Sequence, residues 1–251
     1  MSVTSGFESF WRNVEGLRFK AGDPLEELLL REYGAVFAAR GVVRPDRVLF
    51  DDEGAVRDFQ ERAESASARI GGYEIVLQRA ALEALLNAIG TARGSGLDIT
   101  PRGADSSKRS YEETVELWNS RVEPALVHWV AKQRLSEKQA DEIRGLAIPE
   151  QIREVLRLEN ERIYFAKDLS KSIIYSVAPP GTSQHLAMLA FDISEHGDAS
   201  VREILTGHGW FQTVTSDLPH FTYLGANESE LPGLGLKRVE HGGRAFWVPD
   251  I

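Results

Sequence analysis

Residues 183–192 read Ser-Gln-His-Leu-Ala-Met-Leu-Ala-Phe-Asp, and residues 217–221 read Asp-Leu-Pro-His-Phe. The first stretch predicts a strand over residues 188–193, in which 189, 191 and 193 face the core and 188, 190 and 192 face the other way. Asp192 is therefore expected to face a cleft. A second extended run is expected to begin at His220. The two stretches thus predict that histidine and carboxylate side chains gather near a small sheet.

Two histidines and one carboxylate are ligand types of a catalytic zinc site, which uses three protein ligands and leaves one position open. We expect His185, Asp192 and His220 to bind such an ion. Asp217 is the expected general base and acid for the reacting water. Plainer interpretations exist for each residue: a histidine beside a strand is often structural, and Asp217 can cap a turn or act as a fourth ligand.

The composition excludes some classes of protein. Of the 251 residues, 42% are hydrophobic and 27% charged, which is typical of a globular chain with a substantial core. A net charge of −9 and a pI near 5.3 argue against a nucleic-acid partner. No apolar run is long enough to span a membrane, and residues 1–20 do not have the pattern of a signal peptide. Without cysteine, disulfides and thiolate ligands are excluded, while the compartment stays open.

Hydrophobic periodicity and capping residues predict mainly helices in the first 160 residues. Helices are expected from a capping box at Asp23 and Glu26 toward Gly41, over 53–68 and 74–93, after a capping box at Ser110, from Ser136 and from Pro149. Short strands are expected at 97–100 and 172–177, a helix from Asp198, and a hairpin over 236–248. Helices followed by strands favour an α+β fold with a small antiparallel sheet flanked by helices.

The pattern Ser-x-His-x-x-Gly-x-Ala-x-Asp, followed by an acidic residue, two spacers and His, resembles that of zinc peptidases of bacterial cell walls. These are the VanY-like D-alanyl-D-alanine carboxypeptidases and the related L-alanyl-D-glutamate endopeptidases. Ser183, His185, Ala190, Asp192 and His220 match the pattern. The resemblance implies a hedgehog/DD-peptidase-like fold, Zn²⁺ held by His185, Asp192 and His220, and a peptidoglycan peptide as substrate. It covers roughly residues 97–225, so residues 1–93 are expected to form a helical extension packed on a catalytic domain of 94–251.

Residues 107–113, Ser-Lys-Arg-Ser-Tyr-Glu-Glu, are similar to the family's Ser-Gly-Tyr-Arg-Ser-Tyr-Glu-Glu-Gln segment, whose arginine faces a substrate carboxylate. The resemblance gives that role to Arg109. Arg102 is a rival, because the loop before Arg109 is longer than expected. A surface ion pair with Glu112 or Glu113 is the plainer interpretation for Arg109. Ser183 is expected either to contact substrate or to cap its turn.

Some features leave the activity open. The string around Asp217 favours the endopeptidases, whereas the turn over 180–185 is closer to the carboxypeptidases. Met188 stands where the family has glycine, which raises the question of substrate access. The alternative is a catalytically weak or inactive peptidoglycan-binding or scaffolding protein of the same fold, and a third hypothesis is a zinc amidohydrolase for small substrates. The resemblance implies the cell envelope or periplasm, although no export signal is visible.

Overall fold

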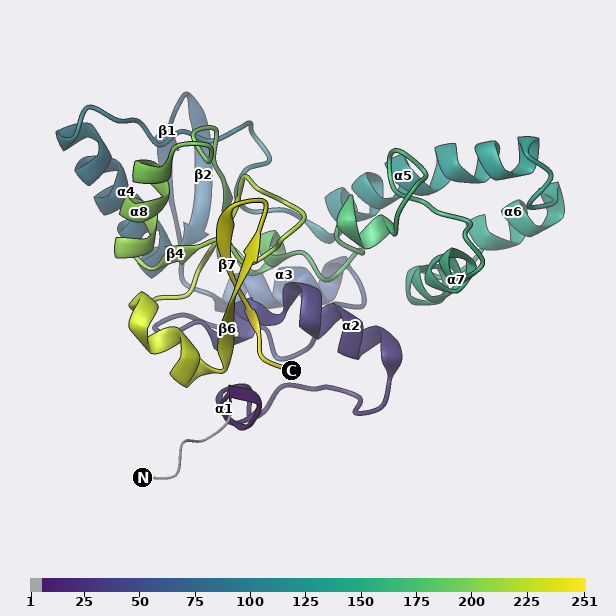
Figure 1. Cartoon of the computed structure of the whole chain (residues 1–251), viewed down its shortest axis with the longest axis horizontal. Helices are drawn as coiled ribbons and strands as arrows, with labels where there is room; N and C mark the ends of the chain where they lie inside the picture. Colours follow the sequence, from purple (N-terminus) through teal and green to yellow (C-terminus); the bar gives the residue numbers. More distant parts are fainter. Residues whose placement is uncertain (1–5) are drawn as a thin grey trace.

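The computed structural model of the chain describes residues 6–251, and it combines helices with small antiparallel sheets (Figure 1). The α-helices are α1 (Gly6–Asn13), α2 (Pro24–Tyr33), α3 (Glu53–Arg62), α4 (Arg79–Gly94), α5 (Tyr111–Ala131), α6 (Glu137–Arg144), α7 (Ile148–Asn160) and α8 (Ala199–Gly207). The 3₁₀ helices are η1 (Gly34–Ala38), η2 (Ile173–Tyr175), η3 (Gln184–Ala187) and η4 (Glu228–Leu234). The strands are β1 (Ser65–Ile70), β2 (Tyr73–Gln78), β3 (Ala190–Asp192), β4 (Trp210–Phe211), β5 (His220–Tyr223), β6 (Leu236–His241) and β7 (Arg244–Pro249).

The largest sheet of the described residues has the strand order β3-β5-β4, and all its pairs are antiparallel. In the register of β3 and β5, Asp192 lies directly opposite His220. Phe191 and Phe221 form the next cross-strand pair and are almost completely buried. The sheet is thus apolar on its core side and carries polar side chains where β3 ends and β5 begins.

The first strand pair, β1 with β2, corrects two of the helix predictions. The helix expected over 53–68 ends at Arg62, and the one expected over 74–93 begins at Arg79. Between them Ser65–Ile70 pairs with Tyr73–Gln78 across Gly71 and Gly72, whose φ angles are +57° and +90°. Two consecutive residues with positive φ form the turn that suits a two-residue hairpin, and Gly-Gly adopts it without steric cost. The turn chemistry therefore overrides the helical periodicity.

Other sequence predictions have mixed outcomes. Residues 97–100 contain no strand, only an isolated bridge between Pro101 and Ile193 next to them. Residues 173–175 form the 3₁₀ helix η2 instead of an extended run. The capping box at Ser110, the helix that starts after Ser136, the Asp198 cap of α8 and the hairpin of β6 and β7 are confirmed. Asp23 caps α2 without the expected capping box, because Glu26 accepts a hydrogen bond from the Lys20 N–H instead. The α+β expectation of small antiparallel sheets flanked by helices is confirmed as well.

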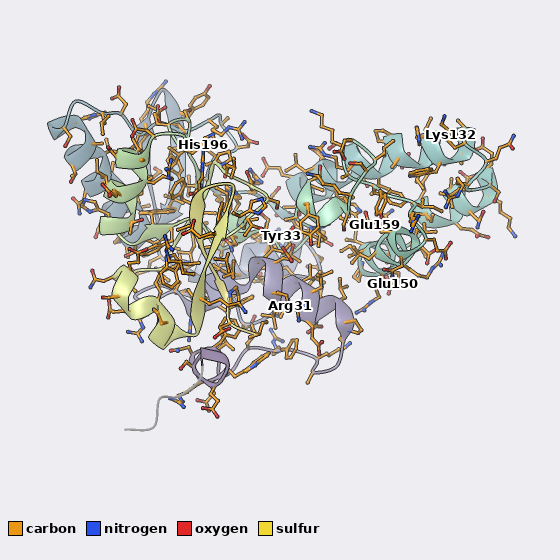
Figure 2. The ribbon with its side chains drawn as sticks, in the orientation of Figure 1. Arg31, Tyr33, Lys132, Glu150, Glu159 and His196 are labelled. Atoms are coloured by element: carbon orange, nitrogen blue, oxygen red, sulfur yellow. The ribbon has the colours of Figure 1, made fainter. Side chains whose placement is uncertain are left out.

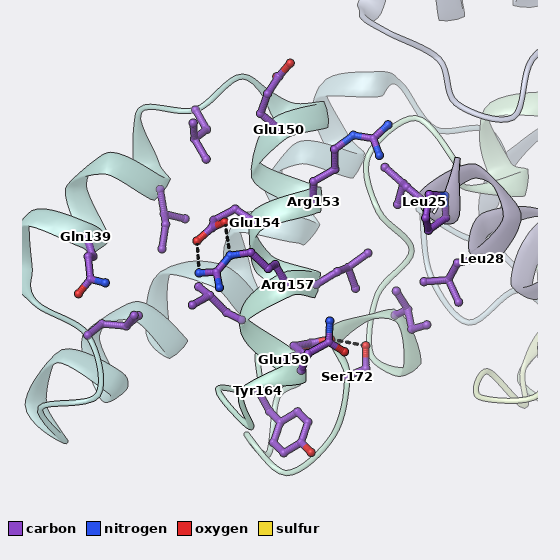
Figure 3. Close-up of a pocket in the computed structure, with 18 of the residues that line it drawn as sticks. Leu25, Leu28, Gln139, Glu150, Arg153, Glu154, Arg157, Glu159, Tyr164 and Ser172 are labelled. Carbon is purple, nitrogen blue, oxygen red and sulfur yellow. Dashed lines mark hydrogen bonds and ion pairs between the residues drawn. The ribbon is translucent and has the colours of Figure 1, made fainter. Parts of the chain in front are cut away.

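Helices α5, α6 and α7 form an arm that extends away from the rest of the molecule (Figure 1). Lys132, just after α5, lies far out along this arm, whereas Tyr33 of α2 lies near its base (Figure 2). A cavity of about 1080 Å³ separates the arm from α2, and Leu25 and Leu28 of α2 line its inner side (Figure 3). The cavity wall is mainly apolar, with the Arg157–Glu154 ion pair on the side of α7.

The N-terminal elements pack against the C-terminal ones. Helix α1 contacts η4 and β6, and α2 contacts β7. Residues from both sides of the expected boundary at 93/94 belong to one hydrophobic cluster. The boundary itself remains a prediction, and within residues 6–93 the extension contains a β-hairpin besides its helices. Among the described helices, none has the length and apolar character needed to cross a membrane.

Met188 has a left-handed backbone conformation, with φ of 55° and ψ of 34°, and caps η3 through a hydrogen bond from its N–H to the His185 carbonyl. The strand predicted from residue 188 begins only at Ala190, so Met188 does not share a strand face with Asp192. Its side chain is 0% exposed and does not line the cleft that contains Asp192. A glycine at this position would relieve the backbone, since only glycine adopts positive φ without strain.

This geometry predicts an inverted order of stability for two variants of Met188. Both Met188→Ala and Met188→Gly lose the buried side chain, at a cost of about 2–5 kcal/mol. Alanine also keeps the left-handed strain of about 1–2 kcal/mol, which glycine removes. We expect Met188→Gly to have the higher free energy of unfolding in urea, although glycine normally costs about 0.5–1 kcal/mol relative to alanine. The same pair at buried Leu189, which lacks positive φ, should show the normal order. The normal order at both positions would contradict this interpretation.

Asp23 connects α2 to the arm. It caps α2, and its two carboxylate oxygens accept hydrogen bonds from Arg153 of α7 at 2.8 and 2.6 Å. These bonds lower the pKa of Asp23 from 3.8 to about 2. Because the folded pKa lies below the unfolded value, the pair's stabilisation is complete above pH ~4 and is lost as the pH falls toward ~2.

We therefore expect the free energy of unfolding of Asp23→Asn to depend less on pH between about 4.5 and 2.5 than that of the native chain. At neutral pH the variant should be less stable by about 1 kcal/mol, a modest figure because Arg153 is partly exposed and the pair is screened by water. Asparagine keeps the helix cap, so the difference reports the ion pair. Parallel pH profiles in urea titrations would exclude this role for Asp23.

Candidate metal centre

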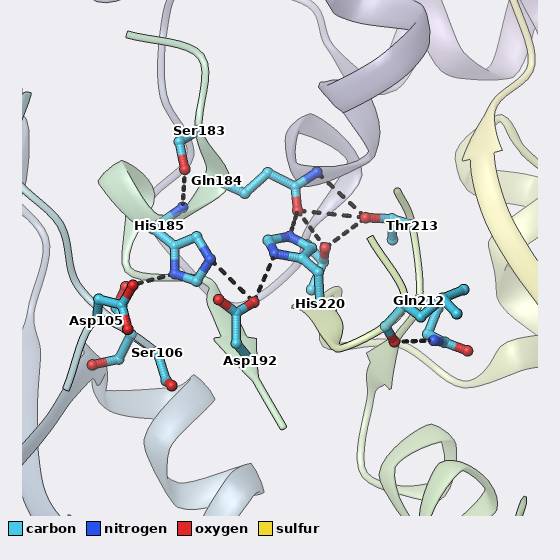
Figure 4. A network of polar contacts seen from close by, with 12 residues as sticks. Asp105, Ser106, Ser183, Gln184, His185, Asp192, Gln212, Thr213 and His220 are labelled. Carbon is cyan, nitrogen blue, oxygen red and sulfur yellow. Dashed lines mark hydrogen bonds and ion pairs between the residues drawn. The ribbon is translucent and has the colours of Figure 1, made fainter. Parts of the chain in front are cut away.

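His185, Asp192 and His220 converge at one point of the molecule (Figure 4). One ligand atom from each lies within 4.8 Å of the others, and all three residues are buried. His185 comes from η3, Asp192 from the end of β3 and His220 from the start of β5. The three residues lie close enough together to bind a metal ion.

The hydrogen bonds of the two imidazoles determine which nitrogens face the centre. The outer nitrogen of His185, Nδ1, lies 2.6 Å from the carbonyl oxygen of Ser107. The outer nitrogen of His220, Nε2, lies 2.9 Å from Oε1 of Gln184. Oxygens of this kind accept hydrogen bonds, so in each neutral ring the outer nitrogen carries the proton. The inner nitrogens then present lone pairs, as a metal ligand must.

Both lone pairs face the same carboxylate oxygen. Oδ1 of Asp192 lies 3.4 Å from Nε2 of His185 and 3.2 Å from Nδ1 of His220. Three electron-rich atoms at this separation repel one another unless a proton or a cation lies among them. A divalent ion satisfies all three atoms at once, so the donor set fits a metal.

Burial and close neighbours shift the pKa values of both His185 and Asp192. Burial lowers the pKa of His185 more than the nearby Asp192 raises it, so the imidazole is neutral at neutral pH. Burial by itself raises the pKa of Asp192, but charge and hydrogen-bond contributions from His185 and His220 more than offset this, so the pKa lies well below its usual range. Asp192 is therefore ionised, and its negative charge favours a proton or a metal ion between the carboxylate and the two imidazoles.

Arg109 lies within the same centre. Its Nη2 donates to Oδ2 of Asp192 at 3.1 Å, and its Nε donates to the carbonyl oxygen of Asp105 at 3.1 Å. The guanidinium thus contacts Oδ2 of Asp192, whereas both imidazoles face Oδ1. The carboxylate that Arg109 contacts in this structure belongs to the protein, whereas the expected ion pair with Glu112 or Glu113 is not formed.

A cleft of about 420 Å³ opens onto the three candidate ligands. Ser183, Asp217 and Arg102, which the sequence assigned to the site, all line it. Ser183 also accepts a hydrogen bond from the His185 N–H and so caps η3. Asp217 is joined to His220 through the turn bond from the His220 N–H to its carbonyl, at 3.2 Å. Within the described part of the chain, the exposed carboxylate of Asp217 has no hydrogen-bond or ion-pair partner.

The residues that orient the histidines lie outside the site predicted from the sequence. Gln184 is buried and accepts from His220, while its Nε2 donates to the Tyr33 carbonyl at 2.8 Å. Thr222 donates to the same Gln184 oxygen and exchanges a hydrogen bond with Thr213 at 2.6 Å. In the sequence, the available signal for these partners is the position of Gln184 directly before His185. A polar side chain that is buried there needs hydrogen-bond partners.

Comparison with protein-family models, with curated proteins and with solved structures found no match to this chain. The site is therefore interpreted from its own chemistry. Two histidines and one carboxylate occur as ligands in zinc hydrolases and also in iron(II) oxygenases. In either case three protein ligands leave positions open for water and substrate.

The orienting role of Gln184 is testable through metal binding. Gln184→Leu removes the acceptor that holds the protonated nitrogen of His220 outward, so the affinity for zinc should fall about 10- to 100-fold. Isothermal titration calorimetry measures this directly. Gln151→Leu is the matched control, because Gln151 is equally buried but binds Trp118 and lies outside the cleft. An unchanged zinc affinity in Gln184→Leu would contradict the assigned role.

Proposed function

We propose that this chain is a zinc-dependent peptidase that hydrolyses peptidoglycan peptides, of the D-Ala-D-Ala carboxypeptidase or L-Ala-D-Glu endopeptidase type. The observation that carries the proposal is the convergence of His185, Asp192 and His220 with their lone pairs directed at one point. A catalytic domain with the hedgehog/DD-peptidase-like fold belongs to the same proposal. The fold part of the proposal rests on the resemblance of these residues to the motif of the cell-wall peptidases.

Zinc is the metal we propose for the site. His185, Asp192 and His220 would hold it, which corresponds to the three-ligand arrangement of catalytic zinc. When bound, zinc supplies Lewis-acid activation of a water molecule and of the substrate carbonyl. Arg109 neutralises the second oxygen of Asp192 and so holds this carboxylate in place beside the histidines.

Asp217 is the proposed general base and acid. It lines the cleft and its carboxylate is exposed. The turn closed by the hydrogen bond from the His220 N–H to the Asp217 carbonyl holds the Asp217 backbone close to that of His220. It would take a proton from the attacking water and then donate that proton to the nitrogen of the leaving amine. A carboxylate without a competing ion pair is suited to this transfer, because no cation has to be displaced first.

The alternative is a peptidoglycan-binding or scaffolding protein with little or no turnover. The matched assay is amine release from a stem peptide with zinc present or removed by a chelator. Release that is abolished by the chelator and restored by zinc supports the peptidase. Binding of the peptide without chelator-sensitive release favours the alternative. Iron-dependent turnover with no zinc-dependent activity would contradict the choice of metal.

Substitution of Asp217 tests the proton-transfer role separately from metal binding. We expect Asp217→Asn to lower kcat about 10²- to 10⁴-fold, the range typical of general acid–base catalysis. The zinc content of the purified protein should be unchanged. Asp58→Asn, an exposed aspartate on α3 outside the cleft, serves as the control. Loss of zinc from Asp217→Asn would instead make Asp217 a ligand.

A further inference from the structure

The charges of the cleft are unevenly paired. Its wall contains Arg102, Arg109 and Arg121 together with Asp105, Asp192 and Asp217. Arg109 pairs with Asp192 and lies 3.8 Å from a carboxylate oxygen of Asp105. Neither Arg102 nor Arg121 has a carboxylate partner among residues 6–251. The three arginines and three aspartates of the wall sum to zero charge, so a bound divalent ion would make the cleft net positive. The whole protein, by contrast, has a net charge of −9.

Of these two arginines, Arg121 is the one whose side chain makes hydrogen bonds within the protein. Its Nε donates to the hydroxyl of Ser176 at 3.1 Å, and its Nη1 donates to the hydroxyl of Ser120 at 2.8 Å. Its Nη2 has no acceptor in the described structure. Arg102 is exposed and has no side-chain hydrogen bond in the same region. Two neutral hydroxyls orient the Arg121 guanidinium without neutralising it, as expected for a group that binds an external anion.

The position of Arg121 on α5 sets its distance from the metal centre. Helix α5 begins at Tyr111, two residues after Arg109, and Leu117 and Arg121 face the cleft one turn apart. Ten residues of helix span about 15 Å, and side chains lean toward the helix N-terminus, which here is the end at the metal centre. An extended peptide advances about 3.3 Å per residue. The guanidinium therefore lies about two to four residues of extended peptide away from the metal ligands.

We propose that Arg121 binds an anionic group of the substrate that lies two or more residues from the cleaved bond. This inference rests on the proposed peptidase function and specifies its substrate class: an extended peptide with an internal carboxylate, rather than a free dipeptide. When the cleaved bond joins the two D-alanines, the stem peptide L-alanyl-γ-D-glutamyl-L-lysyl-D-alanyl-D-alanine has such a carboxylate, on its D-glutamyl residue. The inference therefore applies to the carboxypeptidase type of the proposed function. Ser176 and Ser120 position the arginine for this contact.

The test measures binding by calorimetry to the zinc-loaded protein in an Asp217→Asn background, in which hydrolysis during the titration is about 10²- to 10⁴-fold slower. The probes are the pentapeptide named above, the same peptide with the D-glutamyl α-carboxylate amidated, and acetyl-D-alanyl-D-alanine. Arg121→Ala should weaken binding of the acidic pentapeptide about 10- to 100-fold, as expected for loss of a charge-assisted hydrogen bond. The other two probes should bind as they do without the substitution. Arg121→Lys, which keeps the charge, should retain part of the affinity.

Several results would overturn the assignment. They are an equal loss for all three probes, no loss for any probe, or a carboxylate-dependent loss caused by Arg102→Ala instead. A urea titration of Arg121→Ala shows whether an equal loss of affinity for all probes comes from unfolding. If it does, the affinity of Arg121→Lys for the acidic and the amidated pentapeptide tests the assignment instead. Zinc-dependent hydrolysis without carboxylate discrimination would overturn only the role of Arg121. Failure of the chain with native Arg121 to bind any probe would overturn this role and the proposed function together.

Discussion

The antiparallel register of β3 and β5 is the constraint on which the candidate site depends. It places Asp192 directly opposite His220, although 27 residues separate them in the chain. A slip of one residue would turn Asp192 to the apolar side, because side chains alternate along a strand. The cross-strand pair of Phe191 and Phe221 opposes such a slip, since burying these rings fixes which face is the core. The packing of the core thus specifies the geometry of the polar cluster.

The polar side chains around this register would be costly to bury without partners. Gln184, Thr213 and Thr222 are all buried, yet each makes hydrogen bonds within the same network that orients His220. Leaving one of these groups unpaired in the interior would cost about 1–3 kcal/mol. A well-packed apolar cluster would stabilise this sheet with less demand on geometry. The network therefore indicates that this part of the structure serves to orient the imidazole of His220, at some cost to the stability of the fold.

The sequence predicted the parts of the structure that depend on local chemistry. The caps at Ser110, Ser136 and Asp198 were found because a side chain and a nearby N–H determine them. The histidines and Asp192 could be selected by ligand type, and the structure brings them together. The hairpin of β1 and β2 is not predicted by helical periodicity, because the Gly-Gly turn with two positive φ angles overrides that pattern. Gln184 and the contact of Arg109 with Asp192 could not be predicted, since they depend on residues that meet only after folding.

The conformation of Met188 bears on the choice between a peptidase and a binding protein. In the resemblance to the cell-wall peptidases, methionine at a glycine position raises the question of substrate access. Its buried side chain lies outside the cleft lining, and its positive φ accounts for a glycine preference by backbone strain alone. Methionine at position 188 therefore lowers the stability of the turn that follows η3 and His185, and it does not obstruct the cleft. Within the described residues 6–93 of the N-terminal segment, only Tyr33 lines the cleft. A segment that contributes so little of the wall gives no physical argument against turnover.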